Sequence, residues 1–254
     1  MSGVLGRILA TKATEVERLR GQRLPDPPPR RALGLARGPG EPLRLIAEIK
    51  RRSPSAGALN VTLGVGERAR AYERGGATMV SVLCDESFFD GGFAHLAEAR
   101  RACSLPLLAK EFVIDELQLD AARAYGADAV LIIVRCVEPV RLAPLVRAAR
   151  ERELEPFVEI ASDEEARLAL DAGATLVGVN ARDLDNLAMD GDRAARILAA
   201  LPPTVVSVHL SGLKTPEAVA QVQRGPAHAA LIGEALMRQD DPEPLLRSFV
   251  SAAG

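Results

Sequence analysis

The sequence predicts an eight-stranded (β/α)8 TIM barrel with an N-terminal helical extension. Short apolar runs alternate with helix-period segments rich in Ala, Arg and Glu, which is the pattern of parallel strands joined by crossover helices. A Gly-Ala pair precedes several of these runs, as at Gly76-Ala77, Gly126-Ala127 and Gly173-Ala174, where the glycine suits the position after a helix. Eight such units over about 210 residues match the size of one closed barrel.

The N-terminal region precedes the first apolar run of this pattern. Residues 4–21 follow a helical period with Arg and Glu on the polar side, and the proline cluster at residues 25–29 cannot continue that helix. We therefore expect a helix and a proline-rich linker over residues 1–42, outside the barrel and closing one of its faces. The barrel itself is expected over residues 43–254.

The eight apolar runs give the strands in order. They fall at residues 45–50, 79–83, 106–110, 129–134, 156–160, 176–180, 204–208 and 229–233. Spacings of roughly 22–33 residues leave room for one helix between neighbouring strands. A doubly wound open sheet is the alternative, but it usually has a Gly-rich turn after its first strand, where this chain continues Arg51-Arg52-Ser53-Pro54-Ser55.

Composition excludes several classes of protein. A formal net charge of −2 over 254 residues gives no global field for nucleic acid or a membrane surface. The three cysteines are odd in number and widely spaced, which favours a reducing cytosol over a disulfide framework or a zinc site. The first residues lack the apolar core of a signal peptide, and the longest aliphatic stretch is too short to span a bilayer. We expect a cytoplasmic monomer with no nucleic-acid or membrane partner.

Lysine is rare, so its positions are informative. The chain has four lysines against twenty-eight arginines, and Lys50 and Lys110 end the first and third predicted strands. Arginine stays protonated, whereas a desolvated lysine can have its pKa lowered and exchange a proton near neutral pH. Lys12 and Lys214 lie elsewhere, so chance placement in an Arg-biased composition is the alternative. The two strand-end lysines are candidates for proton transfer.

Other polar residues also end the predicted strands. In a (β/α)8 barrel these ends form the active site, so they are expected to converge. Side chains two residues apart on a strand share a face, which pairs one carboxylate with one lysine on the first strand. The converging residues are Glu48, Lys50, Lys110, Glu159, Asn180 and Arg182. This set suits general acid–base work on an oxygenated substrate, although structural ion pairs at the rim are the alternative.

The last two strands end in small residues that suit a phosphate. Ser211 and Gly212 follow the seventh strand and Gly233 follows the eighth, where barrels build phosphate sites from backbone N–H groups. Ordinary turn glycines are the alternative. No group of His, Asp and Cys has metal-ligand spacing, so we expect no metal.

Seven segments together carry a family resemblance. They run Ile46-Ala47-Glu48-Ile49-Lys50-Arg51-Arg52-Ser53-Pro54-Ser55, Ser81-Val82-Leu83-Cys84-Asp85-Glu86-Ser87-Phe88-Phe89, Lys110-Glu111-Phe112-Val113-Ile114-Asp115, Val158-Glu159, Gly178-Val179-Asn180-Ala181-Arg182-Asp183-Leu184, Ser211-Gly212-Leu213-Lys214-Thr215-Pro216-Glu217 and Gly233-Glu234-Ala235-Leu236-Met237-Arg238. In this order, over residues 43–246, the chain resembles the indole-3-glycerol-phosphate synthase family of tryptophan biosynthesis. The N-terminal helix and linker also fit the extension that this family places before its barrel.

The resemblance implies a carboxy-lyase without a cofactor. Such an enzyme closes the ring of 1-(2-carboxyphenylamino)-1-deoxyribulose 5-phosphate and then releases carbon dioxide and water. It implies that Lys110 is the general acid for the ribulose carbonyl oxygen and that Glu159 is the base of the dehydration. Lys50 is then expected to bind the substrate carboxylate or phosphate and to share the acid role. Glu48 is expected to orient Lys50 or an intermediate.

The resemblance also implies a set of binding residues. Asn180 is expected to bind a hydroxyl or carboxylate, and Arg182 to orient carboxylates. The phosphate is expected among Ser53, Ser211, Gly212, Gly233 and Glu234, the last only through its backbone N–H, because its carboxylate repels phosphate. The aryl ring is expected among Phe89, Phe112, Leu131 and Leu187, with simple core filling as the alternative for the two leucines.

The chain departs from the family pattern at residue 210. The family typically has Glu before Ser-Gly, where this chain has Leu210, and Glu111 stands where Asp is usual. His209 cannot replace that carboxylate, because adjacent strand residues point in opposite directions. We expect tolerated divergence, since Lys110 and Glu159 both remain.

Two other functions stay open at this point. One is a phosphate-ligand-binding barrel that has lost turnover together with the carboxylate at residue 210. The other is a phosphoribosyl-type barrel isomerase acting on aminoaldose phosphates. Those isomerases typically have Asp at the ends of strands one and five, where this chain has Lys50 and Glu159.

Overall fold

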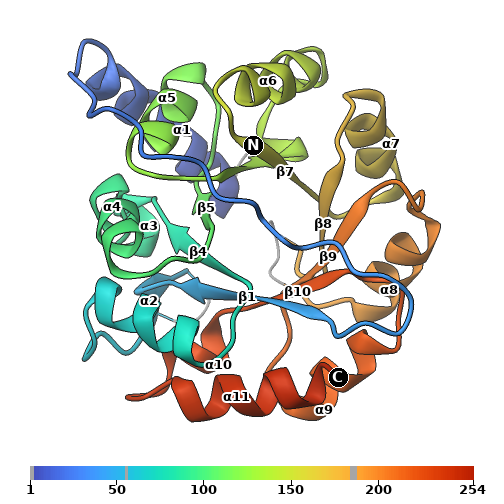
Figure 1. Cartoon of the computed structure of the whole chain (residues 1–254). Coiled ribbons are helices and arrows are strands. Elements are labelled where there is room, and N and C mark those ends of the chain that lie inside the picture. Colours follow the sequence, from blue (N-terminus) through green and yellow to red (C-terminus); the bar gives the residue numbers. More distant parts are fainter. Residues whose placement is uncertain (1–2, 55–56, 184–187) are drawn as a thin grey trace.

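Eight parallel strands close into a barrel in the computed structural model, which describes residues 3–54, 57–183 and 188–254 (Figure 1). The strands are β1 (Arg44–Ile49), β4 (Met79–Leu83), β5 (Leu107–Lys110), β6 (Ala129–Ile133), β7 (Glu155–Ile160), β8 (Leu176–Asn180), β9 (Val206–Leu210) and β10 (Ala229–Ile232). Each strand pairs in parallel with the next along the chain, and β1 pairs with β10 to close the ring. The predicted fold class is confirmed.

Helices between successive strands lie around the outside of the barrel, while α1 precedes the first strand and α10 and α11 follow the last (Figure 1). They are α1 (Val4–Leu19), α2 (Val65–Arg74), α3 (Glu86–Phe89), α4 (Phe93–Ala102), α5 (Glu116–Ala124), α6 (Pro139–Glu151), α7 (Asp163–Asp171), α8 (Gly191–Ala200), α9 (Pro216–Gln223), α10 (Glu234–Met237) and α11 (Glu243–Ala252), with the 3-10 turn η1 (Val134–Cys136) and the short antiparallel pair β2 (Arg52–Ser53) and β3 (Gly57–Ala58). Side-chain caps begin several of the helices. For example, Asp115 accepts from the backbone N–H of Leu117 at the start of α5, and Ser162 accepts from Glu165 at the start of α7.

The seventh barrel strand lies two residues later than the sequence predicts. It was expected over residues 204–208, but β9 covers Val206–Leu210. A turn delays it, because the backbone N–H of Val205 donates to the carbonyl of Pro202 at 3.0 Å. Residues 209 and 210 therefore belong to the strand itself, and residue 210 lies at its carboxyl end.

The N-terminal segment touches both ends of the barrel. Residues Val4, Leu5 and Ile8 of α1 line a pocket at the carboxyl ends of the strands. The linker after α1 then crosses the opposite opening, where it runs in front of the strands in Figure 1. Arg37 is fixed there by the carbonyls of residues just before β10, including Ala227 at 2.8 Å. The expectation that this segment closes one face is too simple, because it covers the other face as well.

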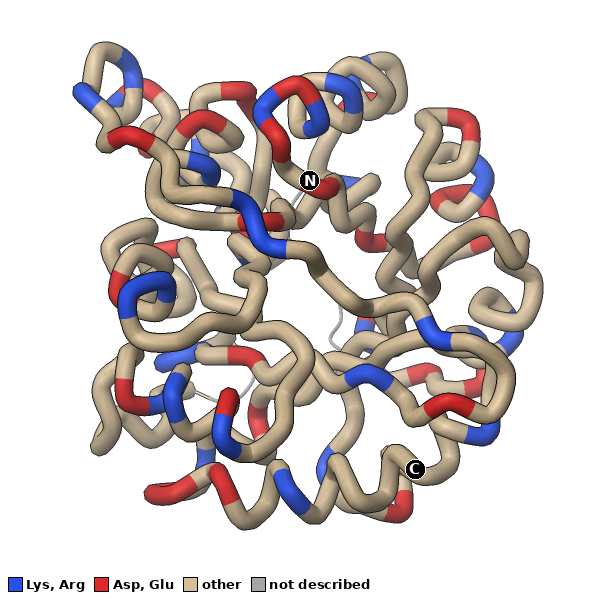
Figure 2. Tube along the Cα trace, viewed as in Figure 1, with Lys and Arg blue, Asp and Glu red and all other residues tan. Residues whose placement is uncertain are grey.

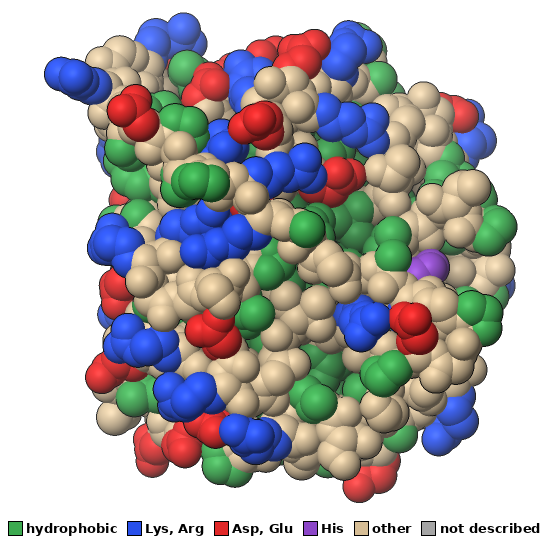
Figure 3. Space-filling model, viewed as in Figure 1, with side chains coloured by type: hydrophobic (Ala, Val, Ile, Leu, Met, Phe, Trp, Pro, Cys, Tyr) green, Lys and Arg blue, Asp and Glu red, His purple; other side chains and the backbone are tan. Residues whose placement is uncertain are grey.

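Charged residues of both signs are mixed around the molecule. Lys and Arg alternate with Asp and Glu along the ring of helices (Figure 2). On the face crossed by the linker, basic, acidic and hydrophobic side chains are interspersed (Figure 3). Within residues 3–54, 57–183 and 188–254, none of the helices combines the length and the apolar character that crossing a bilayer requires.

Candidate active site

One pocket opens at the carboxyl ends of the barrel strands and collects the predicted site residues. It is lined by Glu48, Lys50, Ser53, Phe89, Lys110, Phe112, Leu131, Glu159, Asn180, Arg182, Ser211, Gly212, Gly233 and Glu234. These are all the predicted site residues that the structure describes, and Leu187 lies outside the described residues. The strand ends converge because every strand of a parallel barrel points the same way. The chemical roles assigned to these residues stay predictions.

The polar floor of the pocket is a line of hydrogen bonds. Lys110, the last residue of β5, donates from Nζ to Oε2 of Glu159 on β7 at 3.2 Å. The other oxygen of Glu159 accepts from Nδ2 of Asn180, the last residue of β8, at 2.8 Å. The side-chain oxygen of Asn180 accepts from the backbone N–H of Arg182 at 2.9 Å. Glu159 is therefore held on both oxygens, and its orientation is fixed.

A second ion pair lies on the first strand. Lys50 donates from Nζ to Oε1 of Glu48 at 2.6 Å, as the two-residue spacing predicts. Burial raises the pKa of Glu48, but the charges of Lys50 and Lys110 outweigh it and bring that pKa below its usual value. The pocket thus holds two lysine–carboxylate pairs.

The strand-end lysine on β5 does not behave as expected from burial alone. Desolvation lowers the pKa of Lys110, but the nearby carboxylates of Glu159 and Glu48 more than offset it, and the net shift is upward. The expectation of a lowered lysine pKa is wrong for Lys110, because the paired carboxylates favour its charged form. The charged ammonium form of Lys110 is therefore the favoured one at this position.

One wall of the pocket is apolar. Phe89 at the end of α3 and Phe112 after β5 lie with ring centroids 5.8 Å apart and planes tilted by 35°. Leu131 of β6 belongs to the barrel core and to the pocket lining at once. Leu5 and Ile8 of α1 add to the lining. This wall offers an aromatic ligand a contact surface of aliphatic and aromatic carbon.

The predicted phosphate residues gather around the loops after β9 and β10. Gly233 lies so close to Glu48 that a Cβ there would stand 2.5 Å from Oε1 of that carboxylate. The carboxylate of Glu234 accepts from Arg238 at 2.8 Å, and this hydrogen bond lowers its pKa. Lys214 also lines the pocket, although the sequence analysis had placed it outside the candidate site. Its position in the loop after Ser211-Gly212 was the available signal.

Leu210 takes up the space where the family resemblance leads to the expectation of a carboxylate. It is 2% exposed and lines the pocket at the end of β9. Its side chain and the ring of Phe157 both pack over Gly178, where a Cβ would stand 2.7 Å from Leu210 Cδ1 and 2.4 Å from Phe157 Cε1. His209 is absent from the pocket lining, and its Nε2 lies 3.1 Å from the carbonyl oxygen of Ser211. It does not replace the missing carboxylate, as strand alternation predicts.

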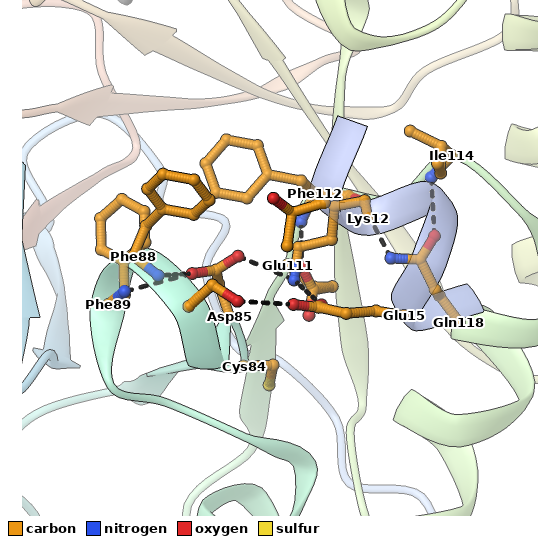
Figure 4. Close-up of polar contacts among 12 residues, drawn as sticks. Lys12, Glu15, Cys84, Asp85, Phe88, Phe89, Glu111, Phe112, Ile114 and Gln118 are labelled. Atoms are coloured by element: carbon orange, nitrogen blue, oxygen red, sulfur yellow. Dashed lines mark hydrogen bonds and ion pairs between the residues drawn. The ribbon is translucent and has the colours of Figure 1, made fainter. Parts of the chain in front are cut away.

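Sequence reasoning missed the role of Lys12. This residue is fully buried on α1, and its ammonium lies 2.8 Å from Asp85 and 2.9 Å from Glu111 (Figure 4). The signal was present in the helix pattern, because Lys12 falls on the same buried stripe as Ile8 and Val16. A lysine on an apolar stripe needs a buried partner.

The described residues contain no group of three or more His, Cys, Asp or Glu side chains placed to hold a metal ion. The site consists of three parts: polar groups that can exchange protons, an apolar wall, and small residues in two loops. The arrangement suits proton transfer on a ligand that has an aromatic part and an anionic part.

Comparisons with known proteins agree with this geometry. The family model for indole-3-glycerol phosphate synthase matches residues 6–249. The indole-3-glycerol phosphate synthase of Exiguobacterium sp. is 40% identical over 245 residues, which cover 96% of this chain and 95% of that protein. Indole-3-glycerol phosphate synthase 2 of Streptomyces coelicolor is 40% identical over 259 residues, covering 98% of this chain and 100% of that protein.

Solved structures with low sequence identity share the fold. The 3-hexulose-6-phosphate synthase of Salmonella typhimurium matches with a TM-score of 0.67 at 15% identity, covering 83% of this chain and 98% of that one. Thiamine phosphate pyrophosphorylase of Pyrococcus furiosus matches with a TM-score of 0.64 at 16% identity, covering 83% of this chain and 95% of that one. Both support the barrel alone. The family model and the full-length relatives go further, and this chain belongs to the indole-3-glycerol phosphate synthase family.

Proposed function

We propose that this chain is an indole-3-glycerol phosphate synthase that acts in tryptophan biosynthesis. It takes 1-(2-carboxyphenylamino)-1-deoxyribulose 5-phosphate, closes the indole ring, and releases one carbon dioxide and one water. Family membership over residues 6–249 supports this reaction. The structural observation that supports this reaction most directly is the hydrogen bond between Lys110 and Glu159. It lies in the pocket that also has the aromatic wall of Phe89 and Phe112.

Lys110 is the general acid of the ring closure. The aromatic carbon that bears the carboxylate attacks the ribulose carbonyl carbon, and the carbonyl oxygen takes a proton from Lys110. This attack interrupts aromaticity, so it needs a strongly polarised carbonyl. The raised pKa of Lys110, set by Glu159 and Glu48 against its burial, keeps that proton in place until the substrate binds. Loss of carbon dioxide then restores the aromatic ring.

Glu159 is the base of the dehydration. The hydroxyl formed from the carbonyl takes a proton from Lys50, which shares the acid role, and leaves as water, while Glu159 removes a proton from the neighbouring carbon to form the second double bond of the five-membered ring. The hydrogen bond from Asn180 holds one oxygen of Glu159 while the other faces Lys110, so both groups stand at the same part of the pocket. A carboxylate fixed in this way is poised to accept the proton.

The remaining residues bind the two ends of the substrate. Lys50, oriented by Glu48 at 2.6 Å, pairs with the substrate carboxylate or phosphate. The aryl ring lies against the wall of Phe89, Phe112 and Leu131. The phosphate lies among Ser53, Ser211, Gly212, Gly233 and the backbone of Glu234, and Asn180 and Arg182 contact the hydroxyl or carboxylate groups.

The protein is further proposed to act as a cytoplasmic monomer. Its three cysteines are free and buried, which suits a reducing compartment. Sedimentation of the purified chain tests the monomer: a single species near 27.0 kDa supports it, and a species of twice that mass rejects it.

The test of the reaction is a fluorescence assay for indole-glycerol phosphate with the purified chain, without added metal or cofactor. Product formation that is lost in Lys110→Met supports the proposal.

The second candidate is a barrel that binds phosphorylated ligands without turnover, and the observation that favours it is the apolar Leu210 at the end of β9. Tight substrate binding without product would select this second function.

A further inference from the structure

Lys12 is a fully buried cation outside the reaction chemistry. It lies in the middle of α1, on the stripe that also buries Leu5, Ile8 and Val16. It does not line the candidate active site. An ammonium without water is unfavourable unless carboxylates surround it, and such a costly arrangement in a helix needs an explanation.

Three carboxylates meet the Lys12 ammonium, from different parts of the fold (Figure 4). Glu15 belongs to α1 itself, Asp85 follows β4, and Glu111 follows β5. Asp85 is 0% exposed and Glu111 is 3% exposed, so this cluster is shielded from solvent. One cation therefore holds two buried carboxylates from neighbouring strands close to each other.

Each of these two carboxylates also holds the backbone of an aromatic residue of the pocket. Oδ1 of Asp85 accepts from the N–H groups of Phe88 at 2.7 Å and Phe89 at 3.1 Å. Oε1 of Glu111 accepts from the N–H of Phe112 at 2.6 Å, and the same oxygen faces Lys12. The rings of Phe89 and Phe112 then meet 5.8 Å apart. Lys12 therefore contacts both carboxylates, Asp85 and Glu111, that hold the backbone of this aromatic pair.

Removing the cation would leave the carboxyl groups of Asp85 and Glu111 facing each other in a dry place without the ammonium between them. Glu111, whose pKa burial already raises, would take up a proton more readily, and in its ionised form it would repel Asp85 strongly where the dielectric is low. In either form the two carboxyl groups would change their spacing. Any such movement passes directly to Phe89 and Phe112 through the hydrogen bonds to their backbone.

We propose that Lys12 is a positioning residue for the aromatic wall: it sets the spacing of Phe89 and Phe112 through Asp85 and Glu111, and so sets how tightly the aryl part of the substrate binds. This inference rests on the proposed function for the identity of the aryl ligand. It assigns the N-terminal helix a part in substrate specificity.

The first test compares two binding constants in Lys12→Met. The probes are the unreactive substrate analogue with its ribulose carbonyl reduced to an alcohol, and inorganic phosphate alone. We expect the Kd of the analogue to rise roughly ten- to a hundredfold and the Kd of phosphate to stay within about twofold. Arg20→Met, directly after the same helix, is the control, because it removes an arginine whose ion pair with Glu17 is exposed. Equal weakening of both probes, or no weakening of the analogue, overturns the proposal.

A double-mutant cycle with Phe89→Ala separates positioning from general stabilisation. If Lys12 acts through the aromatic pair, Lys12→Met adds little loss of analogue binding once the Phe89 ring is gone. The same loss in both backgrounds overturns the proposal, because it would mean that Lys12 acts only by holding the helix.

Asp85→Asn covers the case in which Lys12→Met does not fold. Its amide can offer an oxygen either to Lys12 or to the N–H groups of Phe88 and Phe89, but not to both. We expect the same selective rise in the Kd of the analogue. An unchanged Kd overturns the proposal. These binding measurements do not depend on turnover. If the wild type binds the analogue but forms no product from the substrate, the synthase reaction is rejected and the test of Lys12 still stands.

Discussion

Nζ of Lys110 lies 3.2 Å from Oε2 of Glu159, although 49 positions separate the two residues in the chain. The contact forms because β5 and β7 end at the same rim of the barrel, with only β6 between them. It joins the residue proposed as the general acid to the residue proposed as the base. The first two predictions test the division of labour between them.

Replacing Lys110 with Met removes the proton donor and keeps most of the side-chain volume. We expect kcat to fall by roughly 10²–10⁴-fold. We expect thermal unfolding to remain cooperative, because the residue lies at the pocket surface rather than in the packed core. Single-turnover fluorescence of the indole product measures the loss. Lys110→Arg is the matched control: it keeps the charge but holds its proton too tightly, so it should be nearly as slow. Wild-type kcat in Lys110→Met would remove the acid assignment.

Replacing Glu159 with Gln removes the base and keeps the shape. The amide can still accept from Lys110 or Asn180, so substrate binding should change little while kcat falls roughly 10²-fold or more. Steady-state kinetics that separate kcat from KM check this expectation. An unchanged kcat would exclude Glu159 from the mechanism.

Leu210→Glu tests whether the missing carboxylate is a defect. The new carboxylate would replace an apolar side chain that packs over Gly178 beside Phe157, and it would add an anion to a pocket in which Lys50 and Lys110 already have carboxylate partners. We expect the free energy of unfolding to fall by roughly 1–3 kcal/mol and kcat/KM not to rise. Urea unfolding and the fluorescence assay measure the two quantities. Leu210→Met, which conserves volume, should change both little. A gain in kcat/KM for Leu210→Glu would show instead that Leu210 limits the enzyme.

Gly233→Ala should disturb the Glu48–Lys50 pair. The added Cβ would stand 2.5 Å from Oε1 of Glu48, the oxygen that accepts from Lys50. We expect kcat/KM to fall roughly tenfold or more as Glu48 is displaced. Gly191→Ala, which meets nothing within 4 Å at the start of α8, is the control and should keep wild-type kinetics. Equal kinetics for the two variants would contradict the prediction.

The stability of the fold should depend on pH through Glu111. Burial raises the pKa of this carboxyl to about 7, against the pull of Lys12, from a usual value of 4.5. At a pH between 4.5 and about 7, Glu111 holds a proton in the folded chain but has lost it in the unfolded chain. This group's contribution to the free energy of unfolding therefore falls as pH rises, by at most about 1.4 kcal/mol per pH unit.

Glu111→Gln cannot titrate, so its stability relative to the wild type should improve from pH 5 to pH 7. Urea unfolding of both proteins at several pH values measures the difference. Parallel curves over this window would mean that Glu111 is ionised throughout.

The sequence predicts the barrel and the polar strand-end residues of its pocket because both follow from local pattern, whereas Ser53, Phe89, Phe112 and Leu131 were expected there only from the family resemblance. Apolar runs locate the strands, and parallel topology brings their ends together, so Lys110, Glu159 and Asn180 converge without any knowledge of distances. The start of β9 was misplaced because a turn at Pro202, rather than hydropathy, decides where that strand begins.

Quantities that depend on distances between remote segments could not be predicted. The net pKa shift of Lys110 is the difference between a burial effect and two charge effects, and its sign depends on how closely Glu159 and Glu48 approach. Lys12 escaped notice because its partners Asp85 and Glu111 come from two later strands. Only the docking of α1 brings them within reach of its ammonium.

The linker after α1 is hydrogen-bonded, at the barrel opening opposite the pocket, to residues near the end of the chain, and this affects the order in which the protein can fold during synthesis. Arg37 hydrogen-bonds the carbonyls of Gln223, Gly225 and Ala227, which lie 186 to 190 positions later. A ribosome adding about 5–20 residues per second needs roughly 10–40 seconds to supply them. Arg37 is thus fixed in place later than Arg31, whose partners Cys103, Leu105 and Asp128 are made much sooner. A nascent chain that ends before residue 223 has neither a closed barrel nor the carbonyl groups that hold Arg37.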